Sequence, residues 1–271
     1  MDNRPIGVFD SGIGGLTVAK ELMRQMPRED IIYFGDTARV PYGNRSKETI
    51  IRYAQEIIQF LLQHDVKMII AACNTASATL PESYTKELPV PYTGVVIHGA
   101  QAACALSTSG RIGVIGTAAT VRSATYGRVI RSIRSDAQVF GKACPLFVPL
   151  AENGLFQPDN AIAKLTAEMY LEPLTHENID TLILGCTHFP LFYDIINACF
   201  DYQVTLIDSG QETARFCNRF LAQNHLLKES EDPPVHQFYV TDDPEGFCSN
   251  AAMFLGRRID GNVEQVSVES L

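Results

Sequence analysis

The chain alternates short, almost wholly apolar runs with longer segments whose apolar residues recur at helical spacing. The apolar runs occupy residues 6–10, 31–36, 66–73, 91–97, 111–116, 181–186 and 203–208. Residues 15–26 and 47–63 instead repeat apolar positions at i, i+3, i+4 and i+7, and Ser46 can cap the second of these helices. Near-continuous apolar strands alternating with helices are typical of parallel sheets covered on both faces. The pattern therefore predicts an α/β fold.

The last quarter of the chain breaks this regular alternation. Residues 231–247 carry several prolines and acidic residues, which indicate a surface loop rather than a linker between domains. A last helix and a strand over residues 262–268 are expected to follow.

Three short signals recur in the same order in the two halves of the chain. Each half has an Ile-Gly-Val that opens a strand, then Val-Pro, then a cysteine after an apolar run, at residues 6–8, 40–41 and 73 and again at 112–114, 148–149 and 186. Pro41 follows Ile6 by 35 residues and Pro149 follows Ile112 by 37. The repeat predicts two similar parallel-sheet α/β lobes related by pseudo-twofold symmetry, with the active site in the cleft between them. We assign residues 1–97 plus 208–271 to the first lobe and 98–207 to the second.

Cys73 and Cys186 carry the candidate chemistry, because each ends an apolar strand where ligands of parallel sheets bind. A cysteine at the start of a helix can be held as thiolate by the helix dipole and backbone N–H groups. Two thiols on opposite walls of a cleft can remove a proton from one face of a carbon acid and deliver one to the other face, which inverts a stereocentre. Free cysteines are more often small buried hydrophobic residues, but the polar residues that follow Cys73 and Cys186 favour a functional role.

Composition excludes several classes of function. The chain has 271 residues, 46% of them hydrophobic, a net charge of −9 and a sequence pI of about 5.2. No basic stripe is available for nucleic acid, and no uninterrupted apolar run is long enough for a membrane span. The amino-terminal sequence lacks a signal-peptide pattern, and the seven cysteines form no CxxC pair. We expect a cytoplasmic protein without disulfides that acts on a small molecule.

Five motifs connect the chain with a known family. They are FDSGIGGLTV at 9–18, GDTARVPYG at 35–43, AACNTASA at 71–78, GVIGTAAT at 113–120 and LGCTHFPL at 184–191. Through them the chain resembles the glutamate racemases of the cofactor-independent aspartate/glutamate racemase family along essentially its whole length. The resemblance implies interconversion of L- and D-glutamate, supplying D-glutamate for peptidoglycan, by a two-base mechanism without pyridoxal phosphate, another cofactor or a metal. It also implies a homodimer.

The resemblance further implies roles for individual residues. Cys73 is expected to be the base that acts on D-glutamate and Cys186 the base that acts on L-glutamate, each serving as the acid in the other direction. Asp10 is expected to assist the first thiol, and Glu152 and His188 the second. The implied substrate contacts are Asp10, Ser11, Pro41, Tyr42, Gly43, Asn74, Thr75, Thr117, Thr120, Thr187 and His188. Arg39, the cation nearest these motifs, is as readily explained by a structural ion pair.

His98 departs from the family pattern, since relatives commonly have proline at this point of the segment 95–100. This segment is expected to join the lobes. We expect His98 to be a structural residue, either satisfied or exposed, although it could line the cleft.

Three alternatives to a glutamate racemase stay open. The nearest is a racemase of aspartate or another acidic amino acid, since a one-methylene difference in substrate leaves the thiol chemistry unchanged. A non-catalytic, two-lobed zinc- or ligand-binding protein would use Cys73, Cys186 and His188 as ligands, but their spacing fits no usual zinc motif. A dinucleotide-binding protein is disfavoured because DSGIGG is followed by Thr17 where the third glycine is required.

Overall fold

A computed structural model describes residues 2–259 and 263–271. The strands are β1 Ile6–Asp10, β2 Ile31–Gly35, β3 Met68–Ala71, β4 Tyr92–Gly94, β5 Arg111–Gly116, β6 Gln138–Ala143, β7 Thr181–Gly185, β8 Thr205–Asp208, β9 His236–Val240 and β10 Val263–Gln265. The α-helices are α1 Leu16–Gln25, α2 Lys47–Gln63, α3 Asn74–Thr79, α4 Glu82–Thr85, α5 Val95–Leu106, α6 Ala118–Ser123, α7 Thr125–Ile133, α8 Phe147–Glu152, α9 Ala161–Thr175, α10 Tyr193–Ala198, α11 Ser209–Gln223 and α12 Pro244–Leu255. Short 3-10 turns are η1 Thr37–Arg39, η2 Tyr42–Asn44, η3 Phe189–Phe192 and η4 Val268–Ser270.

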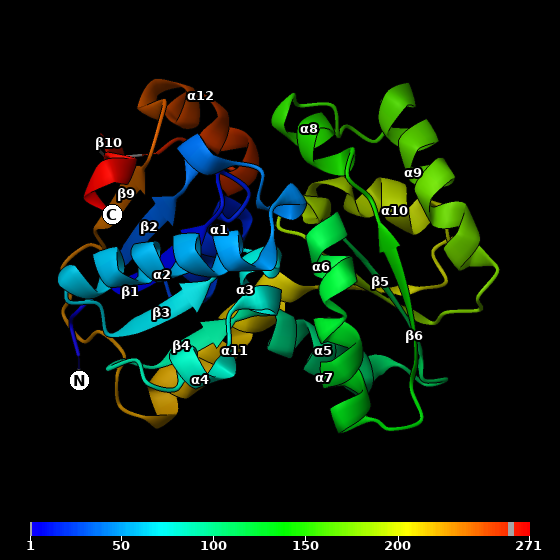
Figure 1. Ribbon diagram of the computed structural model, residues 1–271, viewed down its shortest axis with the longest axis horizontal. Helices are drawn as coiled ribbons and strands as arrows, with labels where there is room; N and C mark the ends of the chain where they lie inside the picture. Colours follow the sequence, from blue (N-terminus) through cyan, green and yellow to red (C-terminus); the bar gives the residue numbers. More distant parts are fainter. Residues whose placement is uncertain (1, 260–262) are drawn as a thin grey trace.

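The strands form two parallel sheets that lie side by side, as Figure 1 shows. The first sheet has the order β10-β9-β2-β1-β3-β4 and the second the order β6-β5-β7-β8. The two sheets share one pairing pattern. In the first sheet β1 pairs with β2 and β3, and β4 lies at the edge beside β3. In the second sheet β5 pairs with β6 and β7, and β8 lies at the edge beside β7. The predicted fold class, two similar parallel-sheet α/β lobes, is confirmed. The exact boundaries at 97/98 and 207/208 stay a prediction.

Apolar sequence explains why these segments become central strands and covering helices. Every residue of β1, β2, β3 and β7 is buried, as expected for parallel strands covered on both faces. Helix α2 has the predicted bounds, buries Ile50, Ala54, Ile57, Ile58 and Leu61, and begins where Ser46 Oγ accepts a hydrogen bond from Thr49 N. Within the described residues, no helix combines the length and apolar character needed to cross a membrane.

Two local predictions were wrong. Residues 231–247 are not one surface loop, because His236–Val240 forms β9, which pairs with β2 along its whole length. The expected strand over 91–97 ends at Gly94, and Val95 begins α5, since an apolar run alone does not distinguish a strand from a buried helix.

His98 lies inside α5, the helix that leads from β4 to β5, and it does not line the cleft. Its side chain is 6% exposed, its Nε2 lies 2.7 Å from Thr93 Oγ1, and its ring stacks on Phe216 with centroids 4.0 Å apart. Burial lowers the pKa of His98 to about 4, so the ring is neutral at physiological pH. The expectation of a satisfied structural histidine is met.

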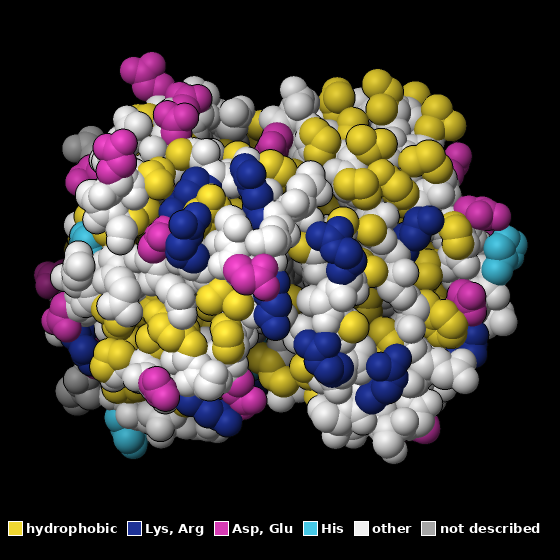
Figure 2. All heavy atoms as spheres, viewed as in Figure 1, with side chains coloured by type: hydrophobic (Ala, Val, Ile, Leu, Met, Phe, Trp, Pro, Cys, Tyr) yellow, Lys and Arg dark blue, Asp and Glu magenta, His cyan; other side chains and the backbone are white. Residues whose placement is uncertain are grey.

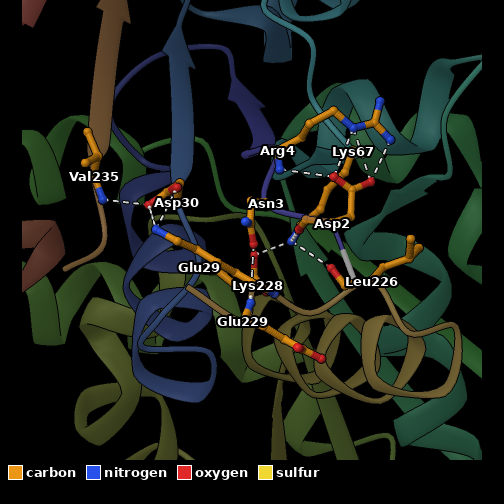
Figure 3. A network of polar contacts seen from close by, with 10 residues as sticks. All are labelled: Asp2, Asn3, Arg4, Glu29, Asp30, Lys67, Leu226, Lys228, Glu229 and Val235. Carbon is orange, nitrogen blue, oxygen red and sulfur yellow. Dashed lines mark hydrogen bonds and ion pairs between the residues drawn. The ribbon is translucent and has the colours of Figure 1, made fainter. Parts of the chain in front are cut away.

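A network of polar contacts lies at the amino-terminal ends of strands β1 and β3 of the first sheet (Figure 3). Lys67 Nζ contacts Glu29 Oε2 at 2.5 Å and donates to the carbonyl oxygens of Asp2 and Leu226, both at 2.8 Å. Glu29 Oε1 accepts from Lys228 N at 2.7 Å. The network thus ties the starts of β1 and β3 to the segment that follows α11.

Candidate active site

One cavity of about 330 Å³ lies where residues following the carboxyl ends of strands from both sheets meet. Cys73 follows β3 of the first sheet and Cys186 follows β7 of the second, and both line this cavity. Its lining residues are Ser11, Gly12, Val40, Pro41, Tyr42, Gly43, Asn44, Cys73, Asn74, Thr75, Thr117, Ala118, Pro145, Val148, Pro149, Glu152, Cys186, Thr187 and His188. The topologically equivalent positions of β3 and β7 therefore bring the two thiols to one site.

Cys73 is buried at the start of α3. Its Sγ accepts a hydrogen bond from Ala76 N at 3.5 Å and donates to Ser11 Oγ at 3.6 Å. Burial, reinforced by the nearby Asp10 carboxylate, raises the pKa of the Cys73 thiol to about 12. The expectation that a helix start holds this cysteine as thiolate is not met, because α3 has only six residues and burial outweighs its backbone N–H groups.

Asp10, the last residue of β1, lies behind the cavity rather than in its wall. It is 1% exposed, and its Oδ2 accepts a hydrogen bond from Gly12 N at 3.0 Å. Burial raises the pKa of Asp10, although the positive charge of His188 opposes that rise. Asp10 is therefore close enough to influence Cys73 electrostatically, although it is not among the residues that line the cavity.

Cys186, His188 and Glu152 form a chain of polar contacts on the opposite wall. Cys186 Sγ lies 3.8 Å from His188 Nδ1, and His188 Nε2 lies 3.0 Å from Glu152 Oε1. Burial lowers the pKa of His188, but its contacts with Cys186 and Glu152 outweigh burial and raise that pKa to about 10. The imidazole of His188 therefore stays protonated at neutral pH, between the Cys186 sulfur and the Glu152 carboxyl group.

The loop that precedes α1 packs against this second wall without an intervening side chain. A Cβ atom on Gly14 would lie 2.3 Å from His188 Cε1 and 2.4 Å from Thr187 Oγ1, so only glycine fits at this close approach. Thr17 Oγ1 donates to the carbonyl oxygen of Thr187 at 2.9 Å. These contacts fix the two halves of the site against each other.

Three threonines form a hydroxyl cluster on the cavity wall. Thr75 Oγ1 lies 2.9 Å from Thr117 Oγ1, and Thr120 Oγ1 lies 3.0 Å from Thr117 Oγ1 and 3.3 Å from Thr75 Oγ1. Thr75 and Thr117 line the cavity, whereas Thr120 does not and contacts both of them.

On another wall of the cavity, the Tyr42 hydroxyl donates a hydrogen bond to Asp36, which also forms an ion pair with Arg39. The interpretation of Arg39 as a structural ion pair therefore fits its environment.

The structure brings most predicted site residues together and adds several. All of the predicted residues line the cavity except Asp10 and Thr120. The lining residues that sequence reasoning did not assign to the site are Gly12, Val40, Asn44, Ala118, Pro145, Val148 and Pro149. The internal repeat had already marked Val40, Val148 and Pro149, and that signal could have identified them as cavity residues.

The zinc interpretation finds no support in the geometry. Within residues 2–259 and 263–271, no group of three or more His, Cys, Asp or Glu side chains is arranged to hold a metal ion.

Comparison with known proteins places the chain among racemases. A family model described as Asp/Glu/hydantoin racemase matches residues 6–217. A glutamate racemase from Geobacter metallireducens is 48% identical and covers 100% of this chain and 99% of its own. The crystal structure of glutamate racemase RacE1 from Bacillus anthracis superposes with a TM-score of 0.93 at 39% identity, covering 99% of both chains. The glutamate racemase from Francisella tularensis, solved in complex with D-glutamate, gives a TM-score of 0.92 at 40% identity over 100% of both chains.

Proposed function

Because the chain belongs to the Asp/Glu/hydantoin racemase family, and is thus an amino-acid racemase, we propose that it interconverts L- and D-glutamate with Cys73 and Cys186 as the two bases. The observation that carries this proposal is the placement of one thiol from each sheet at a single cavity. Two relatives that match this chain over 99% and 97% of their own length, at 48% and 45% identity, are named glutamate racemase.

The polar environments of the two thiols support a division of labour. In the L-to-D direction Cys186 acts as thiolate beside the His188 imidazolium. The Cα–H bond of L-glutamate breaks, its proton goes to the Cys186 sulfur, and the electron pair stays on Cα and its carboxylate. Cys73, which burial keeps protonated, gives its thiol proton to the opposite face of Cα, and a new C–H bond forms as the S–H bond breaks. The reverse reaction exchanges these roles, so the protonation of the pair is one coupled quantity.

The pocket lining supports a small, polar, anionic substrate. Ser11, Asn74, Thr75, Thr117 and Thr187 offer hydroxyl and amide groups at a cavity of about 330 Å³. Such groups can hold two carboxylates without an arginine fork. Asp10 and Glu152 are proposed to act through Cys73 and His188 respectively, because Asp10 lies behind the wall and Glu152 contacts His188.

Incubation of the purified protein with each glutamate enantiomer in D2O, without added cofactor, tests the function. Optical rotation should decay to zero while deuterium enters the α-position. Absence of both inversion and exchange with either enantiomer would sink the proposal. Faster inversion of aspartate than of glutamate would favour the aspartate alternative. One methylene can change the free energy of discrimination between two substrates by about 1–3 kcal/mol, which is about 10–200-fold in kcat/KM.

The cellular setting is part of the same proposal. All seven cysteines are unpaired, which suits the reducing cytoplasm. We propose that the product D-glutamate serves peptidoglycan synthesis. Rescue of a bacterial strain that requires D-glutamate for growth tests this role, and failure of an active, expressed protein to rescue would contradict it.

The pH dependence of activity should report the His188–Glu152 contact. His188 has a pKa of about 10, so the imidazolium beside Cys186 is present below that pH and is lost above it. We expect kcat/KM to fall as pH rises through about 10, equally in both directions because the two enantiomers have equal free energy in solution. Glu152→Gln removes one contact that raises the His188 pKa and should move this fall to lower pH. An unchanged pH profile in Glu152→Gln would contradict the assigned contact.

A homodimer is also proposed, through the apolar surface of α9 and the start of α8. Ile162, Leu165 and Met169 on α9 are 56%, 66% and 57% exposed, and Leu146 beside α8 is 47% exposed. Figure 2 shows apolar side chains gathered over this part of the molecule, at the upper right. Exposed apolar patches of this kind commonly mark protein interfaces.

Leu165→Glu should therefore shift the protein from dimer to monomer in light scattering at micromolar concentration. Ile133→Glu is the matched control, since Ile133 is also exposed, at 47%, but lies at the end of α7. A wild-type monomer, or a dimer that survives Leu165→Glu, would overturn this assignment of the interface.

A further inference from the structure

The side-chain amide of Asn74, at the cavity, has a hydrogen-bond partner for its oxygen but none among the described residues for its nitrogen. Its Oδ1 accepts a hydrogen bond from the Tyr126 hydroxyl at 2.6 Å and lies 3.4 Å from Ser209 Oγ. Its Nδ2 is buried and, among the residues that the structure describes, has no hydrogen-bond partner. Leaving a buried donor unpaired costs about 1–3 kcal/mol, so an orphaned amide at a cavity wall indicates a ligand that accepts from it.

The packing around Tyr126 holds its hydroxyl at Asn74. Tyr126 lies in α7, beside the second sheet, and is 3% exposed. A Cβ atom on Gly99 of α5 would lie 3.4 Å from the Tyr126 hydroxyl oxygen, and one on Gly185 of β7 would lie 3.2 Å from Tyr126 Cε2. The ring therefore packs closely on Gly185, where a side chain would crowd it, and its hydroxyl lies at contact distance from α5. Its hydroxyl reaches across from the second half of the molecule to an amide that follows β3 of the first sheet.

We propose that Tyr126 is a positioning residue that holds the Asn74 amide with Nδ2 free to donate to a carboxylate oxygen of the substrate. The inference rests on the proposed function, because glutamate supplies the carboxylate. Without the Tyr126 donor, the amide can rotate and present Oδ1, and an amide oxygen repels a carboxylate. Ser209 does not replace Tyr126, since the Ser209 hydroxyl also donates to the carbonyl oxygen of Leu184 at 3.2 Å, which is nearer than Asn74.

The bond between Tyr126 and Asn74 also connects substrate binding with the arrangement of the two halves. Asn74 is oriented by a residue from beside the opposite sheet, so its donor is in place only while α7 stays packed against α3. A change in the relative position of the sheets would release the amide. Both proposed bases need that same arrangement, because each comes from a different sheet.

Tyr126→Phe tests the proposal, since it keeps the ring and removes only the donor. We expect KM for both glutamate enantiomers to rise about 10-fold, the loss expected for one hydrogen bond, while kcat changes less than about 3-fold. Tyr170→Phe is the matched control. Tyr170 is 9% exposed, its hydroxyl accepts from Leu146 N at 3.2 Å, and it does not line the cavity. Its KM should stay within about 2-fold of the wild-type value.

A double-mutant cycle with Asn74→Ala separates positioning from general packing. If Tyr126 acts through Asn74, Tyr126→Phe should raise KM no further once the amide is gone. An unchanged KM in Tyr126→Phe, a loss confined to kcat, or a full additional loss in the Asn74→Ala background would each overturn the inference. Those results leave racemisation by the wild type intact, whereas a wild-type protein that fails to exchange α-protons overturns the proposed function itself.

Discussion

Cys73→Ala and Cys186→Ala should each lower the rate of glutamate racemisation by at least about 10³-fold, because each removes one of two obligatory proton carriers. Both cysteines are almost fully buried at the cavity, 5% and 6% exposed, so water has poor access to replace a missing thiol. The remaining thiol can still exchange the proton on its own side. Residual deuterium incorporation should therefore be confined to D-glutamate in Cys186→Ala and to L-glutamate in Cys73→Ala.

The control for these variants is Cys248→Ala, because Cys248 is an exposed cysteine in α12 away from the cavity. It should keep the wild-type rate. Circular dichroism and thermal unfolding of each variant would show whether the fold is retained. Full activity in either Cys73→Ala or Cys186→Ala would remove that residue from the mechanism, and exchange of the opposite enantiomer would reverse the assignment of faces.

The sequence predicted elements best where local and tertiary signals agree. Helix α2 matches its predicted range because its apolar stripe and the Ser46 cap define the same segment. Strand β9 escaped prediction because prolines precede it and acidic residues follow it, although its own residues Phe238–Val240 are buried against the sheet. Its place beside β2 depends on pairing with a strand about 200 residues away, which no local pattern encodes.

The sequence predicted which residues meet at the candidate site, but it did not predict how deeply each of them is buried or how burial changes its pKa. Strand ends and motifs indicated that Cys73 and Cys186 would meet, and both line one cavity. They did not indicate that Asp10 lies behind the wall or that burial would raise the Cys73 pKa, because both depend on the depth of packing around each group. Tyr126 was missed for a similar reason, since its contact with Asn74 exists only after the two sheets come together.

The largest effect on stability should come from Lys67, which belongs to the polar network of Figure 3 and precedes β3, whereas Cys73 of the active site follows that strand. Lys67→Met keeps much of the side-chain volume but leaves the Glu29 carboxylate, only 2% exposed, without its charged partner. Breaking a buried pair on one side typically costs about 3–5 kcal/mol, so we expect a fall in Tm of roughly 10 °C. The activity of the folded fraction should not change, because the network lies where β3 begins and Cys73 lies where it ends.

Lys86→Met is the control that shows how much of the effect of Lys67→Met on stability is due to burial of the ion pair. Its ion pair with Glu82 has the same charges, but the two side chains are 71% and 79% exposed, so its loss should leave the Tm close to the wild-type value. Adding Glu29→Gln to Lys67→Met should recover part of the loss, because a neutral amide is less costly to bury than an unpaired carboxylate. If Lys67→Met unfolds at the wild-type temperature, the Glu29–Lys67 pair does not hold this end of the sheet. If the double variant is less stable than Lys67→Met alone, the penalty comes from the lost carbonyl contacts of Lys67 rather than from the charge left behind.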